Sequence, residues 1–365
     1  MRYIYYCNSA YQLLNVLNLH WQRKHAGFEN IENYEAELLL LNAYEGARDI
    51  ADILRENGTF SRVRLIDKAY NKGPFHSLLT LLDAFFPAFY LASKHRIDPK
   101  EIRNRFDVVS VPKYSPIVDQ IWRLNRKADL ELFEEGIASY HLDFPLEPDS
   151  RWFRLAEKLD HSRHFKDYKS LYVVDKSFYS FTHPERVIQI PAMDKDYLNE
   201  LRQQLAGFDQ KNDEKRDIYW LSQFLNNAEY NVMVDQVLQE LLPYRDRVLF
   251  VQHPRKYLEN RYEFKEAEKK QIWELQLLNM EDPDSKLYIS IHSTACFSAK
   301  MLFDQEPYVI LYYKLGDYEV AHVTREFEDI VMKFKASYRQ PQKVMIPETM
   351  EEYRECLRKF AQGEA

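Results

Sequence analysis

Segments with the pattern of β-strands alternate with segments that have the pattern of α-helices along most of this chain of 365 residues. Short apolar runs rich in β-branched and aromatic residues predict strands, and longer amphipathic stretches predict helices. In the first half the expected strands are 2–7, 37–42, 63–67, 106–112 and 128–133, and the expected helices are 10–25, 46–57 and 115–125. This alternation needs crossover connections, so it predicts a mostly parallel sheet with helices on its faces.

A less regular segment interrupts the alternation in the middle of the chain. Residues 161–195 mix polar residues and proline with short strand-like runs, and we interpret them as an interdomain joint. After it the expected strands are 217–222, 247–252, 286–291 and 308–311, and the expected helices are 228–242 and 295–303. The sequence thus predicts an α/β protein of two facing Rossmann-like domains with a cleft between them. The expected limits are 1–160 for the N-terminal domain, 196–345 for the C-terminal domain and 346–365 for a C-terminal helix.

Composition and charge narrow the class of function. Hydrophobic residues make up 45% of the chain and aromatic residues 15%, which predicts well-filled cores and rings that could stack on sugar faces. The formal net charge of −7 offers no general attraction to a phosphate backbone, so nucleic-acid binding is not expected. Cys7, Cys296 and Cys356 have no paired spacing, which argues against a disulfide framework or a zinc site and for a reducing compartment.

Hydropathy predicts neither a signal peptide nor a membrane span. The apolar run at Met1–Cys7 is too short for a signal peptide, and polar residues follow it at once. The longest apolar stretch, 79–92, contains Asp83 and Pro87 and predicts a buried or interfacial helix. We therefore expect a cytoplasmic protein, and a peripheral contact with the inner face of the membrane and a homodimer both stay open.

Polar residues directly after the expected strands are the candidate site, because doubly wound sheets bind ligands beyond the carboxyl ends of their strands. In the first half these residues are Ser9, Tyr11, Gln12, Glu134, Glu135 and Gly136. In the second half they are Ser222, His253, Pro254, Ser293 and Thr294. Residues from both domains would then form a single composite site.

The pair Glu134-Glu135 precedes Gly136 at the end of an expected strand. Adjacent residues on an extended segment point to opposite sides, so one carboxylate faces a substrate and the other faces the scaffold. The pattern does not decide which, although we favour Glu135 slightly. A carboxylate beside a glycine suits a general base that takes a proton from a hydroxyl, and a solvated turn is the structural alternative. Adjacent carboxylates do not suit a glycosidase, whose two acids stand roughly 5–9 Å apart across one sugar.

His253-Pro254 and Ser293-Thr294 are the two candidate motifs of the second half. Proline ends the strand and restricts the residue before it, so the histidine is held in one orientation. Hydroxyls at the start of a helix favour a phosphate, and simple helix capping explains them equally well. A structural histidine is likewise the alternative to a catalytic one.

Motifs for a metal or for other nucleotide sites are weak or lacking in the sequence. Asp194-Lys195-Asp196 and Asp282-Pro283-Asp284 have the Asp-x-Asp spacing that some sugar transferases use for a metal-bound nucleotide, but neither follows an expected strand. The glycine-rich signatures of P-loop NTPases and of dinucleotide-binding proteins do not occur. We therefore expect no metal and no cofactor.

Taken together, these motifs resemble the bacterial sialyltransferases, most closely the lipooligosaccharide sialyltransferases of glycosyltransferase family 52. That family carries an acidic-acidic-Gly motif, a His-Pro motif and a Ser/Thr pair, which here match Glu134-Glu135-Gly136, His253-Pro254 and Ser293-Thr294 in the same order. The opening stretch from Ser9 to Gln12 is similar to the family's Thr-Pro-x-Gln, but it has Ser for Thr and Ala for Pro. This departure weakens the transfer of an acceptor-binding role to Ser9, Tyr11 and Gln12.

The resemblance implies a GT-B fold and a metal-free, inverting transfer of sialic acid or a related nonulosonic acid from a CMP-activated donor. The acceptor would be a hydroxyl of a surface glycan of the lipooligosaccharide or capsule type. Glu134 or Glu135 would act as base, while His253, Ser293 and Thr294, with Gly136, Pro254 and Ser222 nearby, would meet the nucleotide. Two alternatives stay open: a related transferase that uses another nucleotide sugar, such as a UDP-hexose, and a non-catalytic glycan-binding protein.

Overall fold

The computed structural model describes residues 1–69, 75–141, 150–159, 164–178, 183–205, 216–223, 228–253, 258–267, 272–316 and 323–363. The chain divides into two compact units, residues 1–208 and 209–365. Each unit is built on one parallel sheet with helices on both of its faces, as the alternation of strands and helices predicts.

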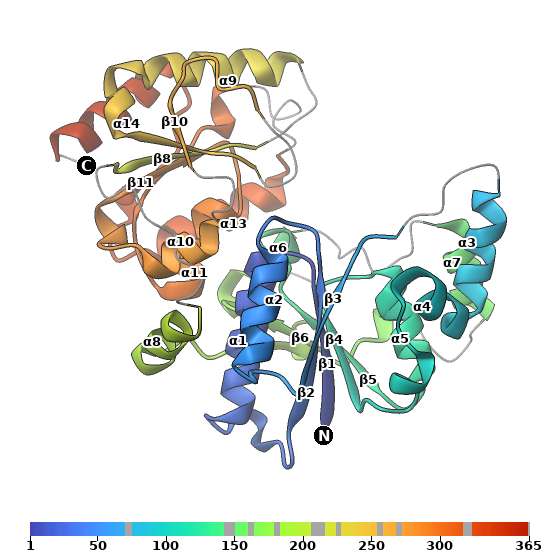
Figure 1. Ribbon diagram of the computed structural model, residues 1–365. Coiled ribbons are helices and arrows are strands. Elements are labelled where there is room, and N and C mark those ends of the chain that lie inside the picture. Colours follow the sequence, from blue (N-terminus) through green and yellow to red (C-terminus); the bar gives the residue numbers. More distant parts are fainter. Residues whose placement is uncertain are drawn as a thin grey trace. The chain divides into compact units, whose positions relative to one another are not determined.

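The first unit contains a seven-stranded sheet with the order β3-β2-β1-β4-β5-β6-β7 (Figure 1). Its strands are β1 (Arg2–Cys7), β2 (Glu35–Leu41), β3 (Arg62–Ile66), β4 (Val108–Val111), β5 (Asp129–Phe133), β6 (Ser170–Val173) and β7 (Val187–Gln189). All neighbouring strands run parallel. Central strands such as β4 are buried along their whole length, which explains why they read as continuous apolar runs.

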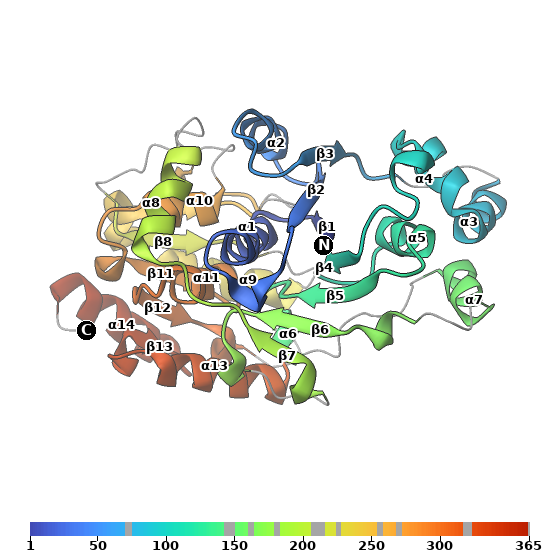
Figure 2. The same ribbon diagram turned by 90° about the horizontal axis from the view of Figure 1, so that it is seen from below.

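The helices of this unit cover both faces of the sheet. They are α1 (Ala10–Lys24), α2 (Ala47–Glu56), α3 (His76–Phe85), α4 (Pro87–His95), α5 (Pro116–Leu124), α6 (Ala138–His141), α7 (Arg151–Leu159) and α8 (Lys195–Gln204). Helix α1 lies over one face, and α4 and α5 lie over the other (Figure 2). Helix α3 is set outside α4 and packs against α4 and α7.

The first unit extends further than the sequence predicts. The expected joint at 161–195 instead contributes β6 and β7, which pair in the first sheet next to β5. Helix α8 also belongs to this unit, because Tyr197 stacks on Trp21 of α1 with ring centroids 4.7 Å apart. The boundary between the units therefore falls after residue 208. The polar segment that contains β6 and β7 is part of the first sheet and is not a linker.

The second unit contains a six-stranded parallel sheet with the order β10-β9-β8-β11-β12-β13. Its strands are β8 (Ile218–Leu221), β9 (Val248–Val251), β10 (Lys265–Glu266), β11 (Leu287–Ser290), β12 (Tyr308–Leu311) and β13 (Val344–Met345). Counted from its own first strand, this is the order 3-2-1-4-5-6, and the first sheet has the same order with one further strand. Both units therefore have the strand order of a Rossmann fold.

The helices of the second unit also lie on both sides of its sheet. They are α9 (Ala228–Glu240), α10 (Trp273–Asn279), α11 (Ala295–Phe303), α13 (Arg325–Ser337) and α14 (Met350–Gln362). Helices α9 and α14 share one side, where Arg354 donates to Glu240 at 2.9 Å, and α10 packs against α11 on the other (Figure 1). The C-terminal helix expected within 346–365 is α14, and the expected helix 295–303 coincides with α11.

One apolar stretch of the first unit differs from its expected form. The single helix expected at 79–92 is divided into α3 and α4, because Phe86 is not helical and Pro87 begins a new helix. In the described part of the chain, no helix combines the length and the apolar character needed to cross a membrane.

Candidate functional site

The motif Glu134-Glu135-Gly136 lies at the carboxyl end of β5, where the chain turns into α6. The Glu134 N–H still bonds to the Tyr172 carbonyl of β6 at 2.9 Å, so the turn begins directly at the sheet edge. Gly136 has φ of 141°, a backbone conformation that side chains with a Cβ rarely adopt. Ser139 of α6 accepts the Glu135 N–H at 2.7 Å. The glycine is therefore required by the turn, and the turn holds both carboxylates in fixed directions.

Glu134 points into the unit and is fully buried. Its carboxylate accepts hydrogen bonds from the hydroxyls of Tyr11 and Tyr140, and from the Val174 N–H at 2.8 Å. Burial raises the pKa of Glu134 to about 7, and the three hydrogen bonds oppose that rise. This carboxylate thus joins α1, α6 and the end of β6 from the inside.

Glu135 points the other way and keeps 20% of its side chain exposed. It forms an ion pair with the ammonium group of Lys113, which follows β4, the neighbour of β5. This division between the two carboxylates is the one that alternation along an extended segment predicts. Glu135 is therefore the carboxylate that a solvent molecule or a substrate can reach.

The other polar residues expected at this edge support the loop after β1. Ser9 caps α1 and accepts the Gln12 N–H at 3.3 Å, while Gln12 accepts the Asn8 N–H at 2.8 Å. Tyr11 and Gln12 are buried, with 4% and 1% of their surface exposed. The sequence predicts acceptor contacts for both, but the structure turns their polar groups inward. Of the three residues, only Ser9 stays partly exposed.

Residues that follow β8 and β9 meet at the carboxyl edge of the second sheet. The His253 N–H donates to the Ser222 hydroxyl at 2.6 Å, and the Ser222 N–H donates to the Val251 carbonyl at 2.9 Å. Ser222 is buried, so its hydroxyl positions the backbone of His253, which is itself partly exposed. Pro254 lies outside the described residues.

The residues that follow β11 belong to the same edge, because β11 is the other neighbour of β8. Ser293 and Thr294 are half-buried and open α11, where the Ser293 hydroxyl accepts the Ala295 N–H at 3.3 Å. Gln223 and His292 also follow expected strands directly, and their side chains approach to 3.1 Å between the two strand ends. The position after a strand pointed to both residues, but the sequence pattern assigned neither of them a role.

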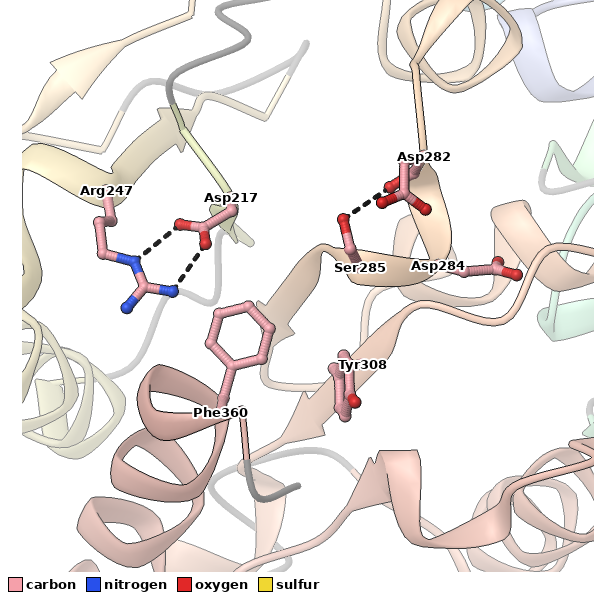
Figure 3. Close-up of a pocket in the computed structure, with 8 residues that line it drawn as sticks. Asp217, Arg247, Asp282, Asp284, Ser285, Tyr308 and Phe360 are labelled. Atoms are coloured by element: carbon pink, nitrogen blue, oxygen red, sulfur yellow. Dashed lines mark hydrogen bonds and ion pairs between the residues drawn. The ribbon is translucent and has the colours of Figure 1, made fainter.

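A separate pocket of about 390 Å³ lies at the amino ends of the strands in the second unit. Figure 3 shows the bidentate ion pair in its wall, in which Arg247 donates to Asp217 at 3.0 and 2.6 Å. Asp282 and Asp284 of the second Asp-x-Asp spacing also line it, and Asp284 accepts the Glu306 N–H at 2.5 Å. The pocket therefore lies at the amino ends of the strands, whereas Ser222 lies at their carboxyl ends. A metal-bound nucleotide at the candidate site could not use the aspartates of this pocket.

Ligand sets for a metal are also lacking elsewhere in the described ranges, which hold no group of three or more His, Cys, Asp or Glu side chains that could bind an ion. The first Asp-x-Asp spacing has a local role, since Asp194 caps α8 by accepting the Tyr197 N–H at 2.8 Å. Cys7 and Cys296 are buried free thiols, and burial raises the pKa of both above the ordinary thiol range.

No protein-family model matches the chain, and no curated protein matches its sequence. Its fold is similar to that of a Listeria monocytogenes protein assigned as a UDP-N-acetylglucosamine 2-epimerase, with a TM-score of 0.52, 10% identity, and coverage of 100% of this chain and 88% of that one. UDP-GlcNAc 2-epimerase from Neisseria meningitidis gives a TM-score of 0.49, 12% identity and full coverage of both chains. The glycotransferase of kitacinnamycin gives 0.48, 10% identity, and coverage of 99% and 90%.

The fold class follows from the two parallel sheets and the similarity to the Listeria protein. Both support an α/β chain of two Rossmann-like units, which confirms the GT-B-like class predicted from the sequence. At 10% identity this similarity concerns the fold alone.

Proposed function

We propose that this protein is a glycosyltransferase that moves a sugar from a nucleotide donor to a hydroxyl of a glycan. The observation that carries the proposal is the accessible carboxylate of Glu135, held by Lys113 at the carboxyl edge of the first sheet. The second sheet presents partly exposed His253, Ser293 and Thr294 at its own carboxyl edge. Such a transfer needs a base for the acceptor hydroxyl and polar groups for the leaving phosphate, and these residues are of the types that supply them.

In the proposed reaction Glu135 acts as the general base. It takes the proton of the acceptor hydroxyl as that oxygen attacks the anomeric carbon, and the bond from that carbon to the nucleotide phosphate oxygen breaks. The ion pair with Lys113 holds the carboxylate in one direction. His253 and the hydroxyls of Ser293 and Thr294 would stabilise the charge that develops on the leaving phosphate. Attack opposite the leaving group inverts the anomeric centre.

The donor that we propose is a CMP-activated sialic acid or a related nonulosonic acid. This choice rests on the resemblance of the three motifs to the lipooligosaccharide sialyltransferases. A surface glycan as acceptor, a cytoplasmic location and independence of metals are part of the same proposal. Glu134 is buried, so it would not act as the base. Its proposed role is to fix the direction of Glu135.

A UDP-hexose is the second candidate donor, because the same fold can host a transfer from another nucleotide sugar. A panel of CMP-sialic acid and UDP-hexoses, each incubated with the protein and a mixture of oligosaccharides, separates the candidates by mass spectrometry. Release of CMP with a sialylated product supports the proposal, and release of UDP with a hexosylated product supports the alternative. If neither nucleotide is released but a glycan binds, the chain is a glycan-binding protein.

Replacing His253 or Ser293 by Ala is expected to weaken binding of CMP by about 1.5–3 kcal/mol each, because each change removes a hydrogen bond to a charged phosphate. Titration calorimetry with CMP measures the loss directly. Ser285→Ala is the matched control, since Ser285 precedes β11 at the opposite sheet edge and its hydroxyl donates to the Asp282 carbonyl at 2.9 Å. Unchanged affinity for CMP in both variants would mean that the nucleotide does not bind at the carboxyl ends of the strands in the second sheet.

Transfer activity is expected to persist in EDTA at the rate measured without it. The reason is chemical: the proposed leaving group carries a single phosphate, which His253 and the two hydroxyls could meet without a divalent ion. A rate assay after dialysis against EDTA checks this expectation. Complete loss of activity that Mg²⁺ or Mn²⁺ restores would contradict it and would favour a metal-bound nucleotide diphosphate sugar.

A further inference from the structure

The outer helices of the first unit expose several large apolar side chains. Six large apolar side chains at α3, α4 and α7 are exposed, among them Phe75 at 70% and Phe86 at 56%. The six are Phe75, Leu78, Phe86, Phe89, Leu155 and Leu159. We call the surface of these three helices, in which α3 packs against both α4 and α7, the α3–α4–α7 face. Scattered single apolar residues are normal on a protein surface, but a group of this size at one place marks an interaction site.

The α3–α4–α7 face is a built surface with defined packing. Helix α3 packs against α4 and α7 and is the outermost element of this side of the unit (Figures 1 and 2). The start of α7 is tied to α3, since Trp152 and Arg151 donate to the Ser77 hydroxyl at 3.1 and 3.4 Å. Leu155 and Leu159 stand one helical turn apart, so they lie on one side of α7.

The charges on these helices are almost all positive at the surface. The exposed bases are Arg151, Arg154 and Lys158 on α7, and Arg96, which directly follows α4. The two acids of the helices are withdrawn: Asp83 is 2% exposed and lies 3.9 Å from Lys94, and the Glu157 side chain is 15% exposed. The whole chain has a net charge of −7, so this face has the opposite sign to the protein that carries it.

We propose that the α3–α4–α7 face docks on an anionic lipid bilayer. Phenylalanine and leucine side chains of this kind enter the boundary between headgroups and acyl chains, while arginine and lysine reach lipid phosphates. Neither signal alone holds a protein stably on a membrane, but the two together do. Charge complementarity favours a lipid surface as the partner, because the exposed bases attract anionic headgroups. The same bases would repel another basic surface, including a second copy of this face.

Sedimentation with lipid vesicles tests the proposal without any nucleotide sugar or acceptor. The protein is expected to sediment with vesicles of phosphatidylglycerol and phosphatidylethanolamine, less so at high salt, and hardly at all with phosphatidylcholine alone. The double variant Phe86→Ser with Phe89→Ser should lower the vesicle affinity roughly tenfold or more. The double variant Arg154→Glu with Lys158→Glu should lower it at least about fivefold for each charge.

Val232→Ser with Met332→Ser is the matched control, because these side chains are 60% and 53% exposed on the second unit and lie outside the face. This variant should bind vesicles as the unaltered protein does. The charge variant decides the question if the phenylalanine variant does not fold. No sedimentation of the unaltered protein, equal sedimentation of all variants, or a dimer that the same substitutions dissociate in the absence of lipid would overturn the proposal. Because the assay contains no sugar donor, its failure would leave the proposed function untouched.

Discussion

Replacing Glu135 by Gln is expected to lower kcat by about 10²–10⁴-fold while the affinity for CMP stays unchanged. The substitution keeps the shape of the side chain but removes the carboxylate that would take the proton from the hydroxyl of the acceptor glycan. Its ion pair with Lys113 and its 20% exposure make Glu135 the reachable member of the pair. Steady-state kinetics at saturating donor and acceptor, together with calorimetry on CMP, separate the loss of turnover from a loss of binding.

Asp129→Asn provides the control for this experiment. Asp129 begins the same strand, β5, at the opposite sheet edge, and it also pairs with a lysine, Lys169, at 2.7 Å. Turnover in this variant should match that of the unaltered protein. A Glu135→Gln enzyme that keeps its rate would place the base elsewhere, even though the carboxylate is accessible.

Replacing Glu134 by Ala is expected to lower the free energy of unfolding by several kcal/mol. The change leaves the hydroxyls of Tyr11 and Tyr140 and the Val174 N–H without their acceptor inside the unit. A buried donor that loses its partner costs about 1–3 kcal/mol. Urea unfolding followed by circular dichroism measures the loss, and stability equal to that of the unaltered protein would contradict this account of Glu134.

Glu134→Gln is the matched variant, and it separates charge from hydrogen bonding. Its amide oxygen can accept from Tyr140 and Val174, while its amide N–H can donate to the Tyr11 hydroxyl oxygen, so much of the network is kept. Burial places the pKa of Glu134 at about 7 in the folded protein, above the ordinary value of 4.5. The unaltered protein should therefore lose about 3 kcal/mol of stability relative to this variant as the pH rises from about 4.5 through 7. Unfolding curves at pH 5 and pH 8 check the slope, and a parallel change in both proteins would contradict the assignment.

Most of the strands could be predicted from the sequence, because fully buried parallel strands read as short apolar runs. The boundary between the units could not, because it depends on long-range pairing. The segment that contains β6 and β7 is rich in polar and turn-forming residues, and only its register with β5 shows that it completes the first sheet. The helical character of 79–92 was predicted from the sequence, but the pattern did not show that the helix would be divided at Pro87 into α3 and α4.

The candidate site was predicted in part by the rule that ligands bind at strand ends. That rule located Ser222, His253 and Ser293, which the order β9-β8-β11 brings to one sheet edge. It failed for Tyr11 and Gln12, since local pattern does not tell an exposed residue of a first helical turn from a buried one. Both side chains form hydrogen bonds inside the protein. The Tyr11 hydroxyl donates to Glu134, and the Gln12 side chain accepts the Asn8 N–H in the loop after β1.

The sequence by itself determined the class of fold and the order of the motifs, because apolar periodicity and turn residues act over a few neighbouring positions. It also established that one carboxylate of the pair must face inward, since adjacent side chains on an extended segment diverge. Only the tertiary structure decided that Glu134 is the inward one. Two of the partners that decide it, Tyr11 and Val174, come from distant parts of the chain and meet at that carboxylate only when the sheet has formed. The third, Tyr140, comes from α6, directly after the turn.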